Sequence, residues 1–431
     1  MTADPLRIVP CGPERRGELL ALDHLAFVWA DEPDPEPMTA GLEWDRTFGV
    51  ENAGTATPTE ATDAATSPLM GIYSVFSLSV VTPAGAGGVD TASVPMAGLT
   101  WVSVHPQHRR RGVLSAMMRH HLHGLHESGA EPVSGLHASE AAIYGRFGYG
   151  LATSGLRLTL PRRPALREVP GAEAVTTRFL TADVAQHTEL VADLYARAAR
   201  HRPGGVLRTA ALDQRQVRDS PFQRRGREPL RLLVAERDGR ATGYALLRRE
   251  VRWDGAVPDG SAQVSELAAV DAATHRAMWG VLTDLDFISR TTTPPMAGDD
   301  PLLSLLVDAR TTNPTKADDL WLRVVDVDRA LAARTYAHDV DVVLGVEDAL
   351  CPWNARRWRL TGGAASATCT STNDAADITL DVRELGAAYL GGTSLVSLTA
   401  AGLVREDRAG AVQALSSALR SALEPATPFM F

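Results

Sequence analysis

One strand–turn–helix unit constrains the fold of this chain more than any other feature. Residues 97–104 carry the apolar pattern of a β-strand, and residues 113–127 repeat apolar side chains at helical spacing. Gly129 follows as a typical residue for ending that helix. Because a short turn joins the strand directly to the helix, we expect a domain in which helices pack on a β-sheet.

The turn inside this unit has the features of an anion-binding site. It consists of Arg109, Arg110, Arg111 and Gly112, and the helix begins directly after the glycine. The first turn of a helix presents unpaired N–H groups and a partial positive charge, which together accept a pyrophosphate. Glycine lets a ligand approach the backbone, and guanidinium groups donate charge-assisted hydrogen bonds to phosphate oxygens. The alternative is a solvated basic turn before an ordinary helix.

Strand and helix patterns alternate on both sides of this unit. Strands are expected at 71–81 and 132–136, a short helix at 139–146 and a further strand from Tyr149. A stretch rich in proline and arginine, 160–170, is typical of a linker. These elements predict an α+β domain of the α/β-like kind.

The middle of the chain repeats this organisation. A hairpin is expected around Asp238-Gly239, and a strand at 263–270 precedes a helix at 274–285. Residues 291–300 are rich in threonine, proline and aspartate and mark a second boundary.

The last part of the chain mixes short strands, such as 320–325, with helices, such as 409–423. It does not repeat the order of the first two parts. The chain therefore divides into three expected domains, which cover residues 1–160, 161–304 and 305–431.

Composition and charge narrow the classes of function. The formal net charge is −9, which argues against general nucleic-acid binding because that usually requires a basic face. Three widely spaced cysteines match neither a zinc site nor a disulfide framework, so a reducing compartment is expected. The first residues lack a signal-peptide layout, and no apolar run approaches the roughly 20 residues that span a membrane. We therefore expect a cytoplasmic protein that binds neither nucleic acid nor membrane.

The basic turn resembles motif A of the GNAT superfamily of N-acetyltransferases, whose pattern is Arg/Gln-x-x-Gly-x-Gly/Ala. Arg109 and Gly112 match this pattern, whereas Leu114 differs from its final small residue. Residues 136–150, Leu-His-Ala-Ser-Glu-Ala-Ala-Ile-Tyr-Gly-Arg-Phe-Gly-Tyr-Gly, resemble the signature of the enhanced intracellular survival (Eis) acetyltransferases of actinobacteria. The chain also ends in the matching phenylalanine, Phe431.

This resemblance implies tandem GNAT folds, the second one degenerate, followed by a sterol-carrier-protein-like domain. Residues 264–278 resemble the strand and helix of the same fold but lack the Arg-x-x-Gly turn, so no second pyrophosphate site is expected. The resemblance also implies a homo-hexamer, acetyl-CoA as the donor, no metal, and pairing of its pantetheine arm with the strand backbone. The residues implied to bind acetyl-CoA are Val102, Ser103, Val104, Arg109, Arg110, Gly112, Val113, Leu114 and Ser139.

In the resembled family a tyrosine is the general acid and the terminal carboxylate is the general base, which implies Tyr144 and Phe431 here. N–H groups at the start of the short helix are expected to favour an ionised Tyr144, while Tyr149 is expected to pack in the core. A terminal carboxylate titrates near about 3.5 and accepts a proton near neutrality only if it is buried or acts through water. The alternatives are a core tyrosine and a frayed chain end, although the apolar ending favours docking.

The acceptor pocket is expected to be aromatic. Trp29 stands near a position, and Met430 at the penultimate position, where the best-known relatives carry acids that would attract polycationic aminoglycosides. Their replacement argues against that activity, unless Asp31, Glu32, Asp34, Glu36 or Glu140 compensates; the alternative is that these acids are solvated. The residues expected to contact the acceptor are Phe27, Trp29, Trp44, Trp101, His137 and Met430.

Two other polar features have plainer interpretations. Ser139 is expected to be the N-cap of the helix that holds Tyr144, and the alternative for His137 is a hydrogen-bonded structural histidine. Four histidines of the helix at 113–127 are expected on a solvated face rather than around a metal: His120, His121, His123 and His126.

Three functions compete. The leading hypothesis is an acetyl-CoA-dependent N-acetyltransferase of primary amines on small molecules, such as aminoglycosides, polyamines or lysine-type groups. The second is a non-catalytic lipid or small-molecule binding protein built around the third domain, and the third is a protein-lysine acetyltransferase. The intact Arg-x-x-Gly turn argues against a pure carrier, because a carrier does not need it.

Overall fold

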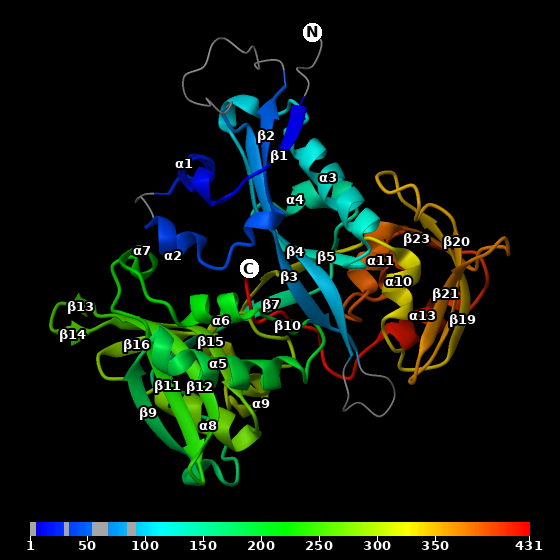
Figure 1. Cartoon of the computed structure of the whole chain (residues 1–431). Coiled ribbons are helices and arrows are strands. Elements are labelled where there is room, and N and C mark those ends of the chain that lie inside the picture. The colour runs from blue at the N-terminus through cyan, green and yellow to red at the C-terminus, as the bar shows by residue number, and fades with distance from the viewer. Residues whose placement is uncertain (1–5, 30–33, 54–67, 84–91) are drawn as a thin grey trace, which may run out of the picture.

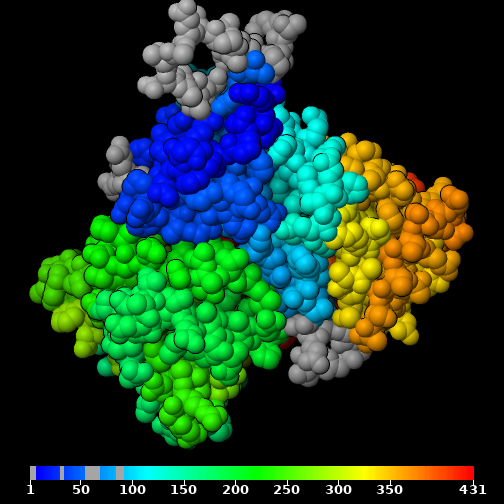
Figure 2. Space-filling model, viewed as in Figure 1, coloured from blue at the N-terminus to red at the C-terminus, as the bar shows by residue number. Residues whose placement is uncertain are grey.

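The computed structural model describes residues 6–29, 34–53, 68–83 and 92–431, which fold around three separate main β-sheets (Figure 1). The part built on the first sheet contacts both of the other parts (Figure 2). Within the described ranges, no helix combines the length and the apolar character needed to cross a bilayer. The predicted α+β architecture is confirmed.

Helices cover both faces of the first sheet. Neighbouring residues of β3 point to opposite faces, so Ile72 packs with Leu19 of α1 while Tyr73 packs with Met117 of α3. The strands lie in the order β1 (Leu6–Pro10), β2 (Thr47–Asn52), β3 (Gly71–Val81), β4 (Ser93–Val104), β5 (Val133–His137), β18 (Leu320–Val324) and β6 (Gly150–Leu151), and the helices are α1 (Arg16–Phe27), α2 (Pro35–Thr39), α3 (Val113–Ser128) and α4 (Ala141–Tyr144).

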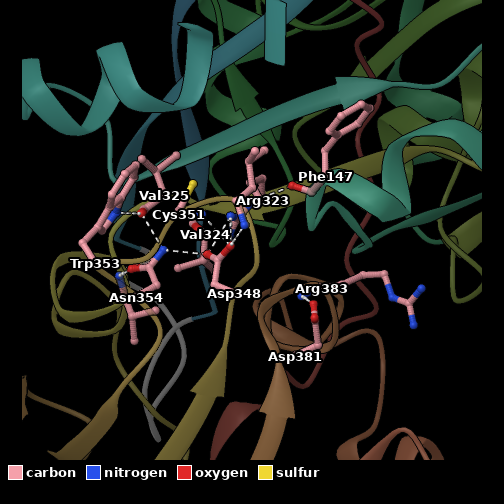
Figure 3. A network of polar contacts seen from close by, with 12 residues as sticks. Phe147, Arg323, Val324, Val325, Asp348, Cys351, Trp353, Asn354, Asp381 and Arg383 are labelled. Atoms are coloured by element: carbon pink, nitrogen blue, oxygen red, sulfur yellow. Dashed lines mark hydrogen bonds and ion pairs between the residues drawn. The ribbon is translucent and has the colours of Figure 1, made fainter. Parts of the chain in front are cut away.

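Two strands of this sheet come from later in the chain: the short β10 (Val206–Leu207), which pairs with β3, and β18. The strand expected at 320–325 is β18, and it pairs with both β5 and β6 rather than with the third sheet. Its buried Arg323 forms an ion pair with Asp348 at 2.6 Å and donates from Nε to the Phe147 carbonyl at 2.9 Å (Figure 3). This strand and its ion pair therefore join the third part of the molecule to the segment just after Tyr144.

The second sheet contains the predicted hairpin, formed by β11 and β12. Asp238 and Gly239 both adopt positive φ angles, 54° and 71°, as a two-residue turn of this kind requires. The strand order is β8 (Thr159–Pro161), β16 (Ile288–Thr292), β15 (Gly260–Ala269), β12 (Arg240–Glu250), β11 (Arg231–Arg237) and β9 (Thr176–Thr181), and the helices are α5 (Val184–Ala199), α6 (Ala210–Val217), α7 (Pro221–Arg224), α8 (Ala272–Leu282) and α9 (Pro301–Leu305).

The third sheet has a different order and is accompanied by four helices. After α13 the chain runs back to the first sheet, so that its end lies near the middle of the molecule (Figure 1). The strands lie in the order β21 (Ala367–Ser371), β20 (Arg357–Gly362), β19 (Val340–Glu347), β22 (Ile378–Asp381) and β23 (Val404–Glu406), and the helices are α10 (Val327–Ala332), α11 (Val382–Ala388), α12 (Leu395–Ala400) and α13 (Ala411–Leu419).

Candidate active site

One cavity of about 910 Å³ beside β4 brings together nearly all of the expected site residues. The exception is Trp44, which is half-buried near Leu19 and Ile72, with the Arg16 guanidinium 5.5 Å from its ring centre. The expected residues that line the cavity are Phe27, Trp29, Trp101, Val102, Ser103, Val104, Arg109, Arg110, Gly112, Val113, Leu114, His137, Ser139, Tyr144, Met430 and Phe431.

The cavity begins where β4 and β5 separate. The two strands pair in parallel only over residues 96–98 and 133–135, and β5 then continues beside β18. A bulge interrupts the pairing of β4 with β3, and its residue Trp101 has a positive φ of 55°. From residue 99 onward, the β5-facing edge of β4 has no strand partner among the described residues. An extended ligand can form main-chain hydrogen bonds with such an edge.

The N-terminus of α3 opens into the same cavity. Gly112 precedes the helix at a φ of 84°, and no side chain caps the helix. The N–H groups of residues 113–115 have no acceptor within the helix, and these residues line the cavity. Exposed Arg109 and Arg110 stand beside them, so this end can hold a pyrophosphate.

Tyr144 ends α4 and borders the cavity with a largely buried side chain. Burial raises the pKa of its phenol to about 12, and the nearby Glu140 carboxylate acts in the same direction. The expectation that helix N–H groups favour an ionised Tyr144 is therefore wrong, because this residue ends the helix instead of beginning it. Tyr149, in contrast, is fully buried, and its hydroxyl lies 2.8 Å from the Ser134 hydroxyl.

The end of the chain is docked rather than frayed. The Thr427 N–H donates to the Asp319 carboxylate at 3.2 Å, and Phe429 is buried. The ring of Phe431 lies where β4 and β5 separate, and a Cβ added to Gly98 would come within 3.1 Å of it. Docking therefore holds Phe431 against the cavity wall, as the apolar ending favours.

His137, at the end of β5, lies next to this docked chain end. Its ring is 4.9 Å from the Phe431 ring in an edge-on arrangement, and its Nδ1 is 3.3 Å from an Asp319 oxygen. Neither ring nitrogen forms a hydrogen bond within the described parts of the chain. Nδ1 therefore faces the Asp319 carboxylate, and contact of His137 with the acceptor stays a prediction.

Aromatic side chains from two domains meet at the other wall. The rings of Phe27 and Trp29 are 6.5 Å apart, and Phe222, in the short helix α7 beside the second sheet, lies 5.3 Å from Trp29. The guanidinium of Arg225 lies 5.7 Å from the Trp29 ring centre. The second domain therefore packs against Trp29 at this wall of the cavity.

Asp23 is a lining residue that the sequence analysis missed. It is 6% exposed, it accepts a hydrogen bond from the Ser103 hydroxyl at 2.9 Å, and burial raises the pKa of its carboxyl group. Its position four residues after Leu19 places it on the buried face of α1, which is a signal that the sequence did contain.

The other acids expected as alternatives lie differently. Glu140 lines the cavity but is exposed, whereas Asp34 and Glu36 are exposed and absent from the lining. Asp31 and Glu32 lie outside the described residues.

Two further expectations are corrected. The N-cap position of α4 is Glu140 rather than Ser139, and no side chain caps this helix. His121 is not on a solvated face, because it is buried and hydrogen bonded to Ser134 at 2.9 Å. Its pKa is lowered to about 3 by burial, so it remains neutral.

Comparisons with known proteins agree with this arrangement. Models of the acetyltransferase (GNAT) domain match residues 17–152 and 204–324, and a model of the sterol carrier protein domain matches residues 327–430. An uncharacterized N-acetyltransferase of Streptomyces avermitilis is 46% identical over 84% of this chain and 87% of its own length. The N-acetyltransferase Eis of Mycobacterium tuberculosis is 38% identical over 78% of this chain and 81% of its own length.

The solved structures give the same result over the whole chain. Eis1 of Mycobacterium abscessus matches with a TM-score of 0.78 and 29% identity, and the match covers 99% of this chain and 100% of that chain. A GCN5-related N-acetyltransferase of Anabaena variabilis, at 18% identity and a TM-score of 0.80, shows the shared fold alone. Two GNAT domains and a C-terminal sterol carrier protein domain make up the chain, and it belongs to the Eis family of N-acetyltransferases.

Proposed function

We propose that this acetyltransferase transfers the acetyl group of acetyl-CoA to a primary amine of a small molecule. Acetyltransferases of the GNAT superfamily use acetyl-CoA, which supplies the acetyl thioester. The observation that carries the proposal is the cavity that joins the open N-terminus of α3 to Tyr144 and the docked Phe431. The free edge of β4 would hold the pantetheine arm, and Arg109 and Arg110 would hold the pyrophosphate.

The proton transfers are assigned to the two residues at the cavity wall. The Phe431 α-carboxylate takes a proton from the acceptor ammonium, directly or through water, which frees the nitrogen lone pair. The new C–N bond forms as the C–S bond breaks, and the Tyr144 hydroxyl gives its proton to the leaving sulfur. Its raised pKa supports this role, because the phenol keeps a proton to donate at neutral pH. The second proton that nitrogen loses on becoming an amide returns to the Tyr144 oxygen, directly or through water.

The test is release of free CoA from acetyl-CoA across a panel of amines. We compare the intact chain with a chain that lacks Met430 and Phe431, since the truncation removes the docked end but leaves α4 and the Arg turn in place. We expect turnover by the intact chain and a loss of at least about a hundredfold in kcat on truncation. If no amine led to CoA release, the proposed function would be wrong. If the truncated chain were fully active, Phe431 would not be the general base.

The same proposal includes a homo-hexamer, which the Eis resemblance implies, and a cytoplasmic location, which the cysteine pattern favours. Size-exclusion chromatography with light scattering measures the mass directly. A mass of six chains is expected, and a monomer at micromolar concentration would contradict the assembly.

A further inference from the structure

The starting observation is an acidic side chain buried at the cavity wall without an ion-pair partner among the described residues. Asp23 is buried on α1 and lines the cavity, and the Ser103 hydroxyl donates to one of its oxygens at 2.9 Å. No ion pair of Asp23 occurs among the described residues, although the His24 and Trp29 side chains lower the pKa of its carboxyl group against the larger effect of burial. Taking a carboxylate out of water without a cation is unfavourable, so a cation that entered here would be strongly attracted.

The walls around Asp23 suit an organic cation rather than a metal ion. Phe27, Trp29 and Trp101 line the same cavity, and aromatic faces attract ammonium groups while they pack against alkyl chains. No group of three or more potential metal ligands occurs in the part of the chain that the structure describes. The arginines of the lining, in contrast, belong to the turn before α3 and to the segment just after Tyr144, not to α1.

A single buried acid also limits the charge of the acceptor. The acids of the described lining are Asp23 and Glu140, and only Asp23 is buried. The lining therefore offers one enclosed position for a cation, separate from the Phe431 carboxylate that takes the proton of the reacting nitrogen.

We propose that Asp23 binds a second cationic group of the acceptor, so that the enzyme selects slender diamines whose apolar chain lies between the aromatic rings. This inference rests on the proposed acetyl transfer. Asp23 acts as a specificity-determining residue: it holds the distant ammonium group, and the other amino group reaches the docked chain end. Ser103 orients the carboxylate through its hydroxyl group.

The experiment combines one substitution, of Asp23, with one change of substrate, the loss of its second amino group. The kcat/KM for diaminopentane is compared with that for pentylamine, which lacks the second amino group, in the wild type and in Asp23→Asn. Asparagine keeps the shape and can accept from Ser103 but removes the charge. Asp34→Asn, which removes an exposed carboxylate outside the cavity, is the matched control.

We expect the wild type to prefer the diamine by roughly tenfold to a hundredfold, as a buried charge-assisted hydrogen bond would give. This preference should disappear in Asp23→Asn, shrink in Ser103→Ala and persist in Asp34→Asn. In Asp23→Asn, kcat/KM should fall far more for diaminopentane than for pentylamine. Equal losses for both amines in Asp23→Asn, or no preference in the wild type, would overturn the assignment.

A binding measurement separates this inference from the proposed function. Diaminopentane should raise the melting temperature of the wild type but not that of Asp23→Asn, whether or not acetyl transfer occurs. If diaminopentane raised the melting temperature of the wild type alone but no CoA were released, the cation site would stand and the proposed acetyl transfer would be wrong. If both amines were acetylated and diaminopentane stabilised both proteins equally, the acetyl transfer would stand and the cation site at Asp23 would be wrong.

Discussion

The first and second GNAT domains share a strand–helix unit but differ at the turn that joins the two elements. In both, the strand, β4 or β15, contains an irregularity and pairs with the next parallel strand only over its first part. The helix α3 follows Gly112 and has no side-chain cap, whereas α8 follows Asp271, whose carboxylate accepts from the Thr274 N–H at 2.8 Å. A carboxylate at this place occupies the groups that would bind phosphate and repels its charge.

In the second domain, the strand that corresponds to β4 is β15, and it carries a buried acid that pairs with an arginine. Glu266 on β15 accepts from buried Arg208 at 2.6 Å, and the Arg208 guanidinium lies 3.4 Å from the Tyr195 ring centre and 5.1 Å from that of Phe429. Phe429 belongs to the docked chain end. Two copies of one fold therefore differ in what they present: the first has an uncapped helix N-terminus beside a basic turn, and the second packs against the docked chain end.

The largest effect is expected at Tyr144, in the first domain. Tyr144→Phe removes the proposed acid, and kcat should fall by about a hundredfold to ten thousandfold, with little change in CoA affinity. Steady-state kinetics with calorimetric CoA binding measure both quantities. Tyr73→Phe is the control, since its hydroxyl meets His120 at 2.6 Å outside the cavity. If Tyr144→Phe kept the wild-type kcat, Tyr144 would not be the general acid.

The next effect concerns the supporting role of the second domain. Arg208→Met leaves Glu266 buried without its cation, so the free energy of unfolding should fall by about 3–5 kcal/mol. Loss of the contact with Phe429 should also loosen the chain end, so kcat should fall while CoA affinity is retained. Chemical denaturation and CoA titration test this, with exposed Arg240→Met as the control. A variant that loses CoA binding but keeps a docked chain end would contradict the division of roles.

A smaller effect is expected in the pH dependence of the first domain. An ordinary tyrosine titrates near about pH 10, but burial raises the pKa of Tyr144 to about 12. The acid form is present below the pKa of the folded protein and is lost only as the pH rises through it. Between about pH 8 and pH 10, kcat should therefore show no fall caused by loss of this proton. A fall centred near pH 9, in protein shown to remain folded, would argue against a buried tyrosine as the acid.

The smallest effect is expected at the turn of the second domain. Asp271→Ala removes the N-cap of α8 and should lower the free energy of unfolding by about 1 kcal/mol. It should not create a second CoA site, because the turn there lacks the arginines of the first domain. Thermal unfolding and CoA titration check both parts. A second bound CoA in this variant would mean that the Asp271 carboxylate alone prevents CoA from binding at α8 in the wild type.

The elements that the sequence predicted correctly are those that local residue patterns determine. The strand expected at 71–81 is β3 as observed, the Asp238-Gly239 turn forms its hairpin, and the helix after Gly112 ends at Gly129. These predictions succeeded because strand alternation, turn conformation and helical spacing each depend on a few neighbouring residues.

The features that the sequence did not predict depend on contacts between distant segments. The strand β18 pairs with β5, nearly two hundred residues earlier, and nothing in its local pattern identifies that partner. The place of Trp44 outside the cavity and the burial of His121 likewise depend on packing of separate elements. Asp23 was overlooked although its place on the apolar face of α1 was visible, because an acid in a helix is usually solvated.

The most direct test of the central claim is calorimetric titration of the full chain with CoA. We predict one CoA per chain in the wild type and in Asp271→Ala. In Gly112→Asp, which gives α3 the carboxylate that α8 carries, affinity should fall by more than about tenfold. Gly112→Asn tolerates the same positive φ without the charge and should bind more tightly than Gly112→Asp. Two CoA per chain, or wild-type affinity in Gly112→Asp, would contradict the claim that the open turn of the first domain is the donor site.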